Sequence, residues 1–147
     1  MNRMKNITKF KILKPANEVF EAFVDPSKIG NFWFSSSSER WQEGKVITLK
    51  YDLYNAEGNI RIIEIQENKK IVFAWGETED SNIVTISLDQ IEHNQTNIEI
   101  TEEGFNETDS EYVNHLVDNK EGWVFMLSCL KCYLEFGVNQ LRGALIK

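Results

Sequence analysis

The feature that most constrains the fold is an unbroken helix-compatible stretch near the end of the chain, from Asp118 to Gly137. Asp118 and Glu121 have the spacing of a capping box, and Gly137 is a typical residue just past a helix end. Thr108 and Glu111 have the same capping-box spacing, and residues 109–117 are expected to form a separate turn or two that leads into this helix. The stretch between Asp118 and Gly137 contains no proline, and its roughly 18 residues predict a helix of about 27 Å. Apolar side chains occupy most of its circumference, so the helix needs cover on more than one side. We therefore expect a curved sheet to grip it.

Five strands are predicted before this helix. Apolar and polar residues alternate from Val46 onward over about sixty residues, which is the period of half-buried strands. Turn-forming residues interrupt the alternation at 55–58, 68–70, 79–82 and 93–95. The adjacent Ile62 and Ile63 break the pattern and predict either a bulge or burial on both faces of the strand. Strands of seven or eight residues span about 25 Å, so a twisted meander can wrap the helix along nearly its full length.

The residues before Val46 add one strand and two short helices. Residues 5–14 alternate and predict an edge strand with its lysines outward. Pro15 suits the first position of a helix that extends to Phe23, and Asp25-Pro26 predicts a second short helix ending near Phe32. The four serines at 35–38 are interpreted as a mobile gate. The fold class is therefore α+β: a single helix-grip domain, residues 1–147, in which a curved antiparallel sheet of about six strands wraps the terminal helix.

Three segments carry a resemblance to a known family. They are residues 15–26, the strand Ile71 to Trp75, and the helix residues from Glu121 to Glu135. In this order they resemble the opening, the fourth strand and the last helix of the SRPBCC superfamily, which includes START and birch-pollen-allergen-like proteins. The last helix resembles the branch similar to the C-terminal part of the activator of the heat-shock-protein-90 ATPase. The resemblance covers nearly the whole chain and implies a deep apolar cavity between sheet and helix.

Aromatic and apolar side chains at the places that correspond to this cavity are the candidate ligand-binding residues. Trp33 and Phe34 end the second short helix and are expected to guard the entrance. The walls are expected to be formed by Tyr51, Trp75, Trp123, Met126, Leu127 and Leu130. The aromatic side chains of such a pocket would stack on a flat or apolar ligand, and Trp N–H and Tyr O–H groups would form hydrogen bonds with its polar atoms. The alternative is that these residues simply fill a close-packed core.

Charge and hydropathy limit the classes of partner. The net charge of −7 argues against sequence-independent binding of nucleic acid and against binding to an anionic membrane surface. No run approaches the roughly 18 apolar residues of a membrane span. The N-terminus also lacks the apolar core of a signal peptide, so we expect a cytoplasmic protein.

The remaining reactive residue types predict little chemistry. Cys129 and Cys132 form a C-x-x-C motif in the middle of the predicted helix, within an apolar sector, where buried free thiols are expected rather than redox or metal sites. We expect no metal and no cofactor. His115 is interpreted as a solvated side chain, and Glu102 and Glu103 as solvated charges at the end of a strand.

The functional hypothesis from sequence is the binding of a small hydrophobic or aromatic molecule, lipid-like or flavonoid-like, with no catalytic residue assigned. One alternative is a chaperone-interaction module that regulates the heat-shock-protein-90 ATPase, with a role in the stress response. The other is a cyclase or hydrolase that uses the same cavity. For this enzyme the only polar candidates are Tyr51 and His115.

Overall fold

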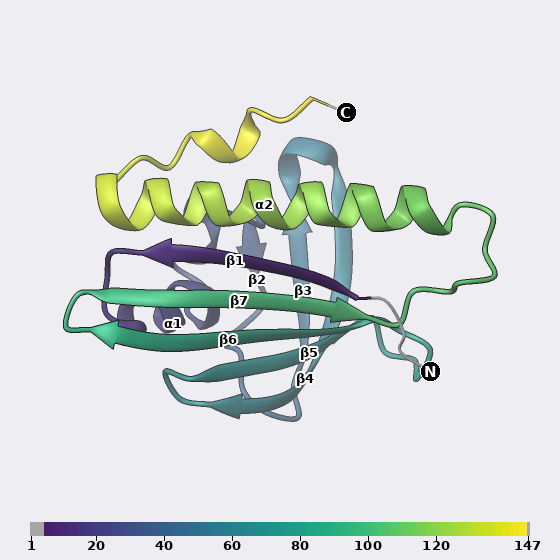
Figure 1. Ribbon diagram of the computed structural model, residues 1–147, viewed down its shortest axis with the longest axis horizontal. Helices are drawn as coiled ribbons and strands as arrows, with labels where there is room; N and C mark the ends of the chain where they lie inside the picture. Colours follow the sequence, from purple (N-terminus) through teal and green to yellow (C-terminus); the bar gives the residue numbers. More distant parts are fainter. Residues whose placement is uncertain (1–4, 147) are drawn as a thin grey trace.

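The computed structural model describes residues 5–146, in which a long helix lies over a curved antiparallel sheet (Figure 1). The strands are β1 (Asn6–Ile12), β2 (Ser36–Ser37), β3 (Val46–Tyr51), β4 (Ala56–Gln66), β5 (Lys70–Trp75), β6 (Ile83–Glu92) and β7 (Gln95–Glu103). The α-helices are α1 (Ala16–Val24) and α2 (Tyr112–Phe136). Three 3₁₀ turns complete the described elements: η1 (Ile29–Asn31), η2 (Asp52–Tyr54) and η3 (Leu141–Gly143). The predicted α+β helix-grip class is confirmed.

The sheet follows the predicted meander with one strand more than expected. Its order is β1-β7-β6-β5-β4-β3-β2, so β3 to β7 are five consecutive antiparallel neighbours and β1 is an edge. The described part of the sheet has seven strands rather than about six, because Ser36 and Ser37 pair with Lys50 and Leu49. Part of the serine segment is therefore a short edge strand. Small polar residues carried no alternation from which that pairing could be predicted.

Two predictions for β4 and the turn before it, the bulge and the position of the reversal, can be compared with the structure. The register with β5 shifts between Ile62 and Glu64, and Ile63 is left 40% exposed while Ile62 is 1% exposed, so the bulge, rather than burial on both faces, is confirmed. The predicted hairpin turn at residues 55–58 lies earlier than expected, because η2 and Asn55 make the reversal. Asn55 has a φ of 50°, a left-handed conformation that asparagine tolerates through local side-chain hydrogen bonds.

Helix α2 ends as predicted and begins earlier. Gly137 has a φ of 70°, and its N–H and that of Val138 bond to carbonyl groups of the last turn, as in a Schellman motif. The helix starts at Tyr112 rather than Asp118, so the turns expected at 109–117 are largely continuous with it, and its 25 residues span about 37 Å. Its N-cap, Glu111, makes no side-chain capping bond. The second predicted short helix is only the single turn η1.

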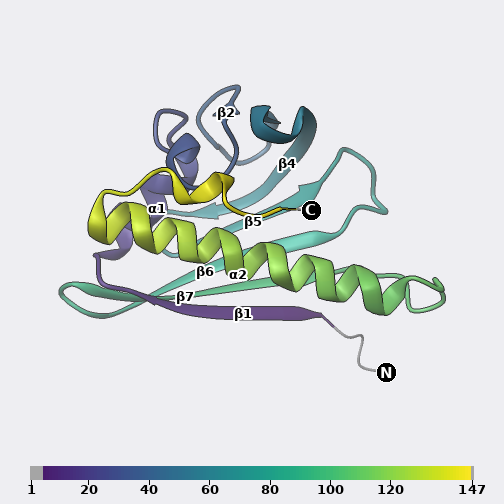
Figure 2. The same ribbon diagram turned by 90° about the horizontal axis from the view of Figure 1, so that it is seen from above.

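Side chains of α2 cover the open edge of the sheet. Figure 2 shows α2 running alongside β1. Lys131 donates from Nζ to the carbonyl oxygen of Lys11 at 2.8 Å, and Lys120 donates to the carbonyl oxygen of Ile7. The N–H of Leu13 in turn donates to Glu135 Oε2 at 2.8 Å. These bonds engage backbone groups that an exposed edge strand would offer to another chain.

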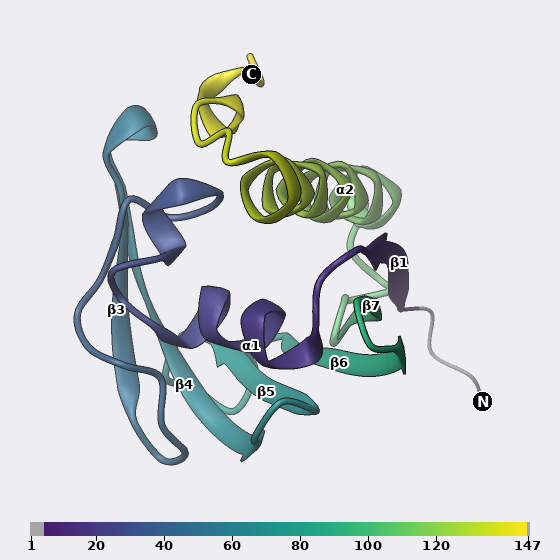
Figure 3. The same cartoon turned by 90° about the vertical axis from the view of Figure 1, so that its left-hand side faces the viewer.

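The core lies in the trough of the sheet. Seen end-on in Figure 3, the sheet curves from β3 round to β1, with α1 in the concavity and α2 over the β1 side. Helix α1 buries one apolar face here, including Val19 and Phe23, which are both fully buried. The C-terminal segment after α2 lies between α2 and the β3 side of the trough (Figure 3). This segment and α2 frame the region where the candidate residues gather.

Candidate functional site

Three indole rings from distant parts of the sequence meet beneath α2. Trp33 follows η1, Trp75 ends β5 and Trp123 lies on α2. The centroid of the Trp33 ring lies 5.5 Å from that of Trp123 and 6.3 Å from that of Trp75, and the last two are 6.3 Å apart. We call these three residues the tryptophan cluster. Aromatic pairs at such distances stabilise one another beyond their area burial, so the cluster is a well-ordered wall.

Two pockets open on either side of this cluster. The apolar pocket has a volume of about 250 Å³ and is lined by Phe32, Trp33, Tyr51, Tyr54, Gly122, Phe125, Met126 and Leu145. The tryptophan pocket has a volume of about 260 Å³ and is lined by Trp33, Trp75, Asp118, Asn119, Gly122 and Trp123. The two pockets share Trp33 and Gly122 and are therefore neighbours.

Gly122 keeps the space between the pockets open. It lies in the interior of α2, and a Cβ built on it would meet no heavy atom within 4 Å. A glycine at an interior helix position costs about 1 kcal/mol relative to alanine. Because no packing contact requires a glycine here, its effect is to leave room where any other residue would place a side chain.

The structure places the predicted site residues in three groups. Five line one or both pockets: Trp33, Tyr51, Trp75, Trp123 and Met126. Phe34 packs against the rings of Trp33 and Tyr51, with centroid distances of 4.9 and 5.6 Å. Leu127 and Leu130 are fully buried in the hydrophobic core and line neither of these pockets.

Glu102 is the functional candidate that sequence reasoning missed. It was expected to be solvated, but it is only 2% exposed. Its Oε1 accepts hydrogen bonds from Trp75 Nε1 at 3.2 Å, Trp123 Nε1 at 3.1 Å and Asn119 Nδ2 at 2.8 Å, and its Oε2 accepts one from Asn82 Nδ2 at 2.9 Å. All four partners are N–H donors, so the side chain acts purely as an acceptor, as a carboxylate does. We call Glu102 and these four partners the Glu102 network.

This network changes the expected role of the indoles. The N–H groups of Trp75 and Trp123, expected to form hydrogen bonds with a ligand, are already bound to Glu102. The hydroxyl of Tyr51 likewise donates to the carbonyl oxygen of Arg142 at 3.0 Å. The tryptophan cluster therefore offers ring faces to the pocket. Oε1 accepts three of the four hydrogen bonds and Oε2 accepts one, so the carboxylate holds the two indoles and α2 in place.

The C-terminal segment forms the outer wall of the apolar pocket. Arg142 donates from Nε to the carbonyl oxygen of Trp33 at 2.9 Å and from Nη2 to Ser35 Oγ at 2.8 Å. Its guanidinium lies 4.9 Å from the centre of the Tyr51 ring, a cation–π contact. Burial raises the pKa of the Tyr51 hydroxyl above its ordinary value, although the positive charge of Arg142 opposes this.

The cysteines and His115 lie where the sequence placed them. Cys129 and Cys132 are free thiols on α2, and burial raises the pKa of Cys129 to about 11. His115 is exposed, with Nδ1 3.9 Å from Asp109 Oδ2. Within residues 5–146, no group of three or more His, Cys, Asp or Glu side chains could hold a metal ion, and no helix is both long and apolar enough to cross a membrane.

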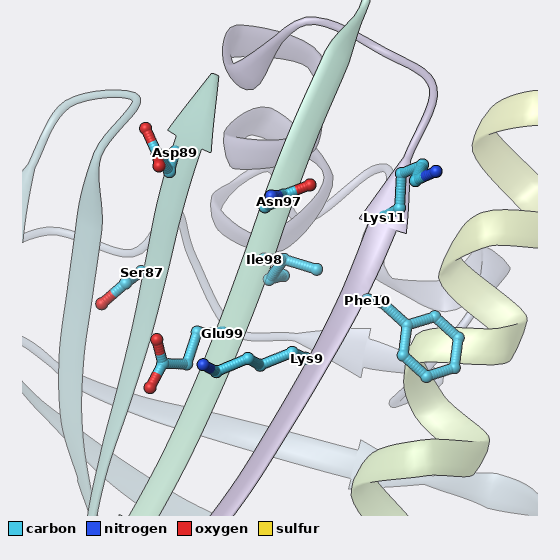
Figure 4. Close-up of a pocket in the computed structure, with 8 residues that line it drawn as sticks. All are labelled: Lys9, Phe10, Lys11, Ser87, Asp89, Asn97, Ile98 and Glu99. Atoms are coloured by element: carbon cyan, nitrogen blue, oxygen red, sulfur yellow. The ribbon is translucent and has the colours of Figure 1, made fainter. Parts of the chain in front are cut away.

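A larger hollow of about 440 Å³ lies over β1, β7 and β6, and most of the residues that line it are polar or charged. Figure 4 shows Lys9 pointing toward Glu99, with Asn97, Ser87 and Asp89 on the neighbouring strands. Salt and water compete for such a surface, so it suits an apolar ligand less well than the pockets beside α2.

Comparison with known proteins identifies the fold and the family. The family model described as Activator of Hsp90 ATPase homolog 1-like protein matches residues 14–135. The crystal structure of protein SSP2350 from Staphylococcus saprophyticus is 50% identical, with a TM-score of 0.81 over 92% of this chain and 95% of that one. No protein with curated annotation matches the sequence.

Two more distant structures share the fold alone. The solution structure of the Aha1 dimer from Colwellia psychrerythraea is 17% identical, with a TM-score of 0.78 over 91% of this chain and 98% of that one. CalU16 from Micromonospora echinospora is 19% identical, with a TM-score of 0.72 over 95% of this chain and 83% of that one.

Proposed function

The chain belongs to the family of Activator of Hsp90 ATPase homolog 1-like proteins, a branch of the SRPBCC superfamily, and we propose that it binds a small hydrophobic or aromatic molecule in the two pockets beside α2. The ligand is lipid-like or flavonoid-like, and the protein acts in the cytoplasm. The observation that carries this proposal is the pair of pockets that meet at Trp33 and Gly122.

The composition and size of the pockets support a ligand of modest size. Each pocket is slightly smaller than the 300 Å³ or so at which drug-sized sites begin, so a ligand that spans both is favoured. Aromatic rings line both of them and bind apolar surface without losing much side-chain entropy. A ligand of about 20 heavy atoms at about 0.3 kcal/mol each gives about −6 kcal/mol, or a dissociation constant of tens of micromolar.

The decisive experiment fills the space at Gly122. We expect Gly122→Leu to weaken binding by at least about tenfold, because its side chain occupies the room between the pockets. The variant should unfold at a temperature no lower than the wild-type protein, since leucine is a far better helix former than glycine. Gly122→Ala, which adds only a methyl group, is the matched control for helix stability.

Binding is measured by tryptophan fluorescence against a panel of lipid-like and flavonoid-like compounds, with NMR spectra as a second readout. Native mass spectrometry of the protein from the cell provides the ligand class, because a co-purified molecule adds its own mass. A panel that leaves both spectra unchanged, or a Gly122→Leu protein that binds as well as the wild type, would refute the proposal.

A second candidate function is an interaction with a chaperone of the Hsp90 class. The name of the matched family supports it, and so does an exposed apolar strip on the first turns of α2. Val113 is 66% exposed and Val117 59% exposed on this strip. If this function holds, the protein pulls down the chaperone and changes its ATPase rate, and replacing both valines with aspartate abolishes both effects while leaving small-molecule binding intact.

The enzyme alternative has less support. His115 is exposed and lines neither pocket, and the hydroxyl of Tyr51 donates to the carbonyl oxygen of Arg142. The raised pKa of Tyr51 also makes its phenolate harder to form near neutral pH. Neither of the two polar residues proposed for a cyclase or hydrolase is therefore placed to act on a ligand in these pockets.

A further inference from the structure

We propose that the tryptophan pocket receives a positively charged group, an amine or a quaternary ammonium, carried by the apolar ligand. The inference rests on the proposed function and names the chemical class of the ligand. It also sets the orientation of the ligand, with the charged end against the tryptophan cluster and the apolar body in the neighbouring pocket.

The carboxylate of Glu102 is buried without a basic side chain beside it among residues 5–146. Glu102 is 2% exposed, and no Lys, Arg or His among residues 5–146 lies within 4.0 Å of its carboxylate. Four N–H donors lower the cost of burying this charge but do not neutralise it. A cation that enters the adjoining pocket gains the attraction of this charge in surroundings that screen it less than water does.

The indole rings of the tryptophan pocket also favour a cation. Trp33, Trp75 and Trp123 all line the tryptophan pocket, which is the arrangement of an aromatic cage for a cation. Two of the three donate their N–H groups to Glu102. Such a bond to a carboxylate pushes electron density into the ring and strengthens the negative potential on its faces. The hydrogen bonds therefore favour a cation at the very rings that form the wall.

The two pockets also differ in the charged side chains that lie beside them. Asp118 also lines the tryptophan pocket, and no Lys or Arg among residues 5–146 lines either pocket. The guanidinium of Arg142 lies over the ring of Tyr51, which lines the apolar pocket and not the tryptophan pocket. The negative end of the site is thus the tryptophan pocket and the positive end is the C-terminal segment. A cationic amphiphile fits this polarity, whereas a fatty-acid carboxylate placed in the tryptophan pocket opposes it.

The test uses three probes with the same aromatic ring and different charges: 1-naphthylmethylammonium, 1-naphthylmethanol and 1-naphthylacetate. Binding to the full-length protein is measured by calorimetry and ligand-observed NMR. We expect the ammonium to bind about tenfold more tightly than the alcohol, and the acetate to bind most weakly. Added salt should narrow the difference, because the pocket opens to solvent and Asp118 in its lining is exposed.

Two variants locate the source of the preference. Glu102→Gln should reduce the preference for the ammonium over the alcohol to about threefold or less. Asp118→Asn, an isosteric change on the helix surface, should reduce it more modestly, and it keeps the test conclusive if Glu102→Gln does not fold. Glu103→Gln removes the same charge from the next residue of β7, which is exposed, and should leave the preference unchanged.

The outcomes separate this inference from the proposed function. If the alcohol or the acetate binds as tightly as the ammonium, the inference is overturned and the proposed function stands. If the preference survives in both Glu102→Gln and Asp118→Asn, the inference is overturned as well. If none of the three probes binds to a protein that also ignores the wider panel, the proposed function fails with it.

Discussion

Replacing Glu102 with alanine tests whether the buried carboxylate organises the open end of the trough. The change removes the acceptor of four hydrogen bonds that join β5, the β5–β6 turn, β7 and α2. We expect Glu102→Ala to destabilise the fold by about 3 to 4 kcal/mol, whereas Glu102→Gln should cost about 1 to 2 kcal/mol.

The magnitude follows from the donors that are left behind. The indole N–H of Trp123 belongs to a ring that is 4% exposed, so without Glu102 it loses its partner and stays largely hidden from water. An unsatisfied buried donor costs about 1 to 3 kcal/mol. Trp75, Asn82 and Asn119 are partly buried and recover some of their loss by binding water. Glutamine keeps an oxygen for the three donors on the Oε1 side but loses the charge and the acceptor of the bond from Asn82.

The assay is urea unfolding followed by far-UV circular dichroism, which avoids the fluorescence of the tryptophans under study. With a slope of about 1.5 kcal/mol per molar, a loss of 3 kcal/mol lowers the midpoint by about 2 M. The indole N–H signals of Trp75 and Trp123 should also exchange faster with water in Glu102→Ala. Glu103→Gln, with its exposed side chain, should stay within about 0.5 kcal/mol of the wild type.

One result would refute this reasoning directly. If Glu102→Ala unfolds within about 1 kcal/mol of the wild type, the four hydrogen bonds do not organise the site. If Glu102→Gln is as destabilised as Glu102→Ala, the oxygen that glutamine keeps contributes nothing, and the smaller loss expected for glutamine is wrong.

Three further predictions concern other parts of the molecule. Burial raises the pKa of Cys129 to about 11 and so favours the neutral thiol in the folded state; in Cys132→Ser the remaining thiol should resist alkylation near pH 8, and its contribution to stability should be lost as pH rises from about 9 toward 11. Arg142→Ala should free the C-terminal segment, so limited proteolysis followed by mass spectrometry should show faster cleavage after Gly137 with the rest of the chain intact. The hydrogen bond from Arg40 lowers the pKa of Glu21, so this surface pair should contribute about 0.5 kcal/mol above pH 4.5 or so and lose it as pH falls through the lower folded value; Arg40→Gln should remove that part of the acid sensitivity of the urea midpoint.

Local patterns were sufficient to predict the fold because every strand except β2, and the C-terminal end of α2, carried a signal of its own. The alternation from Val46 predicted five consecutive strands, and the doubled isoleucine at 62 and 63 predicted a bulge or burial on both faces, of which the register confirms the bulge. Gly137 ends α2 in the conformation expected of it. These features depend on neighbours within a few residues, so tertiary contacts had little opportunity to override them.

The features that could not be predicted depend on contacts between distant residues. The first turns of α2 have few buried side chains, and one of their contacts is a hydrogen bond from Asn6 Nδ2 to the carbonyl oxygen of Leu116. Strand β2 likewise exists through pairing with β3, not through its own pattern of serines. The C-terminal segment is positioned by hydrogen bonds from Tyr51 to Arg142 and from Tyr54 to Leu145, and each bond joins residues 91 positions apart in the chain.

In the candidate site, the burial of Glu102 could be predicted from local sequence, whereas its hydrogen-bond partners could not. Ile98 and Ile100 face the core, so the period of two places Glu102 on the same inner face of β7, and its burial follows from the alternation that predicted the strand. The prediction of a solvated charge at the strand end was wrong because the alternation continues through residue 102. Its four donors come from 17 to 27 residues away, and no local pattern could have named them. A carboxylate that the register sends inward must meet donors or a cation there. An inward-facing charge in a strand therefore marks a place to look for a binding site before the partners are known.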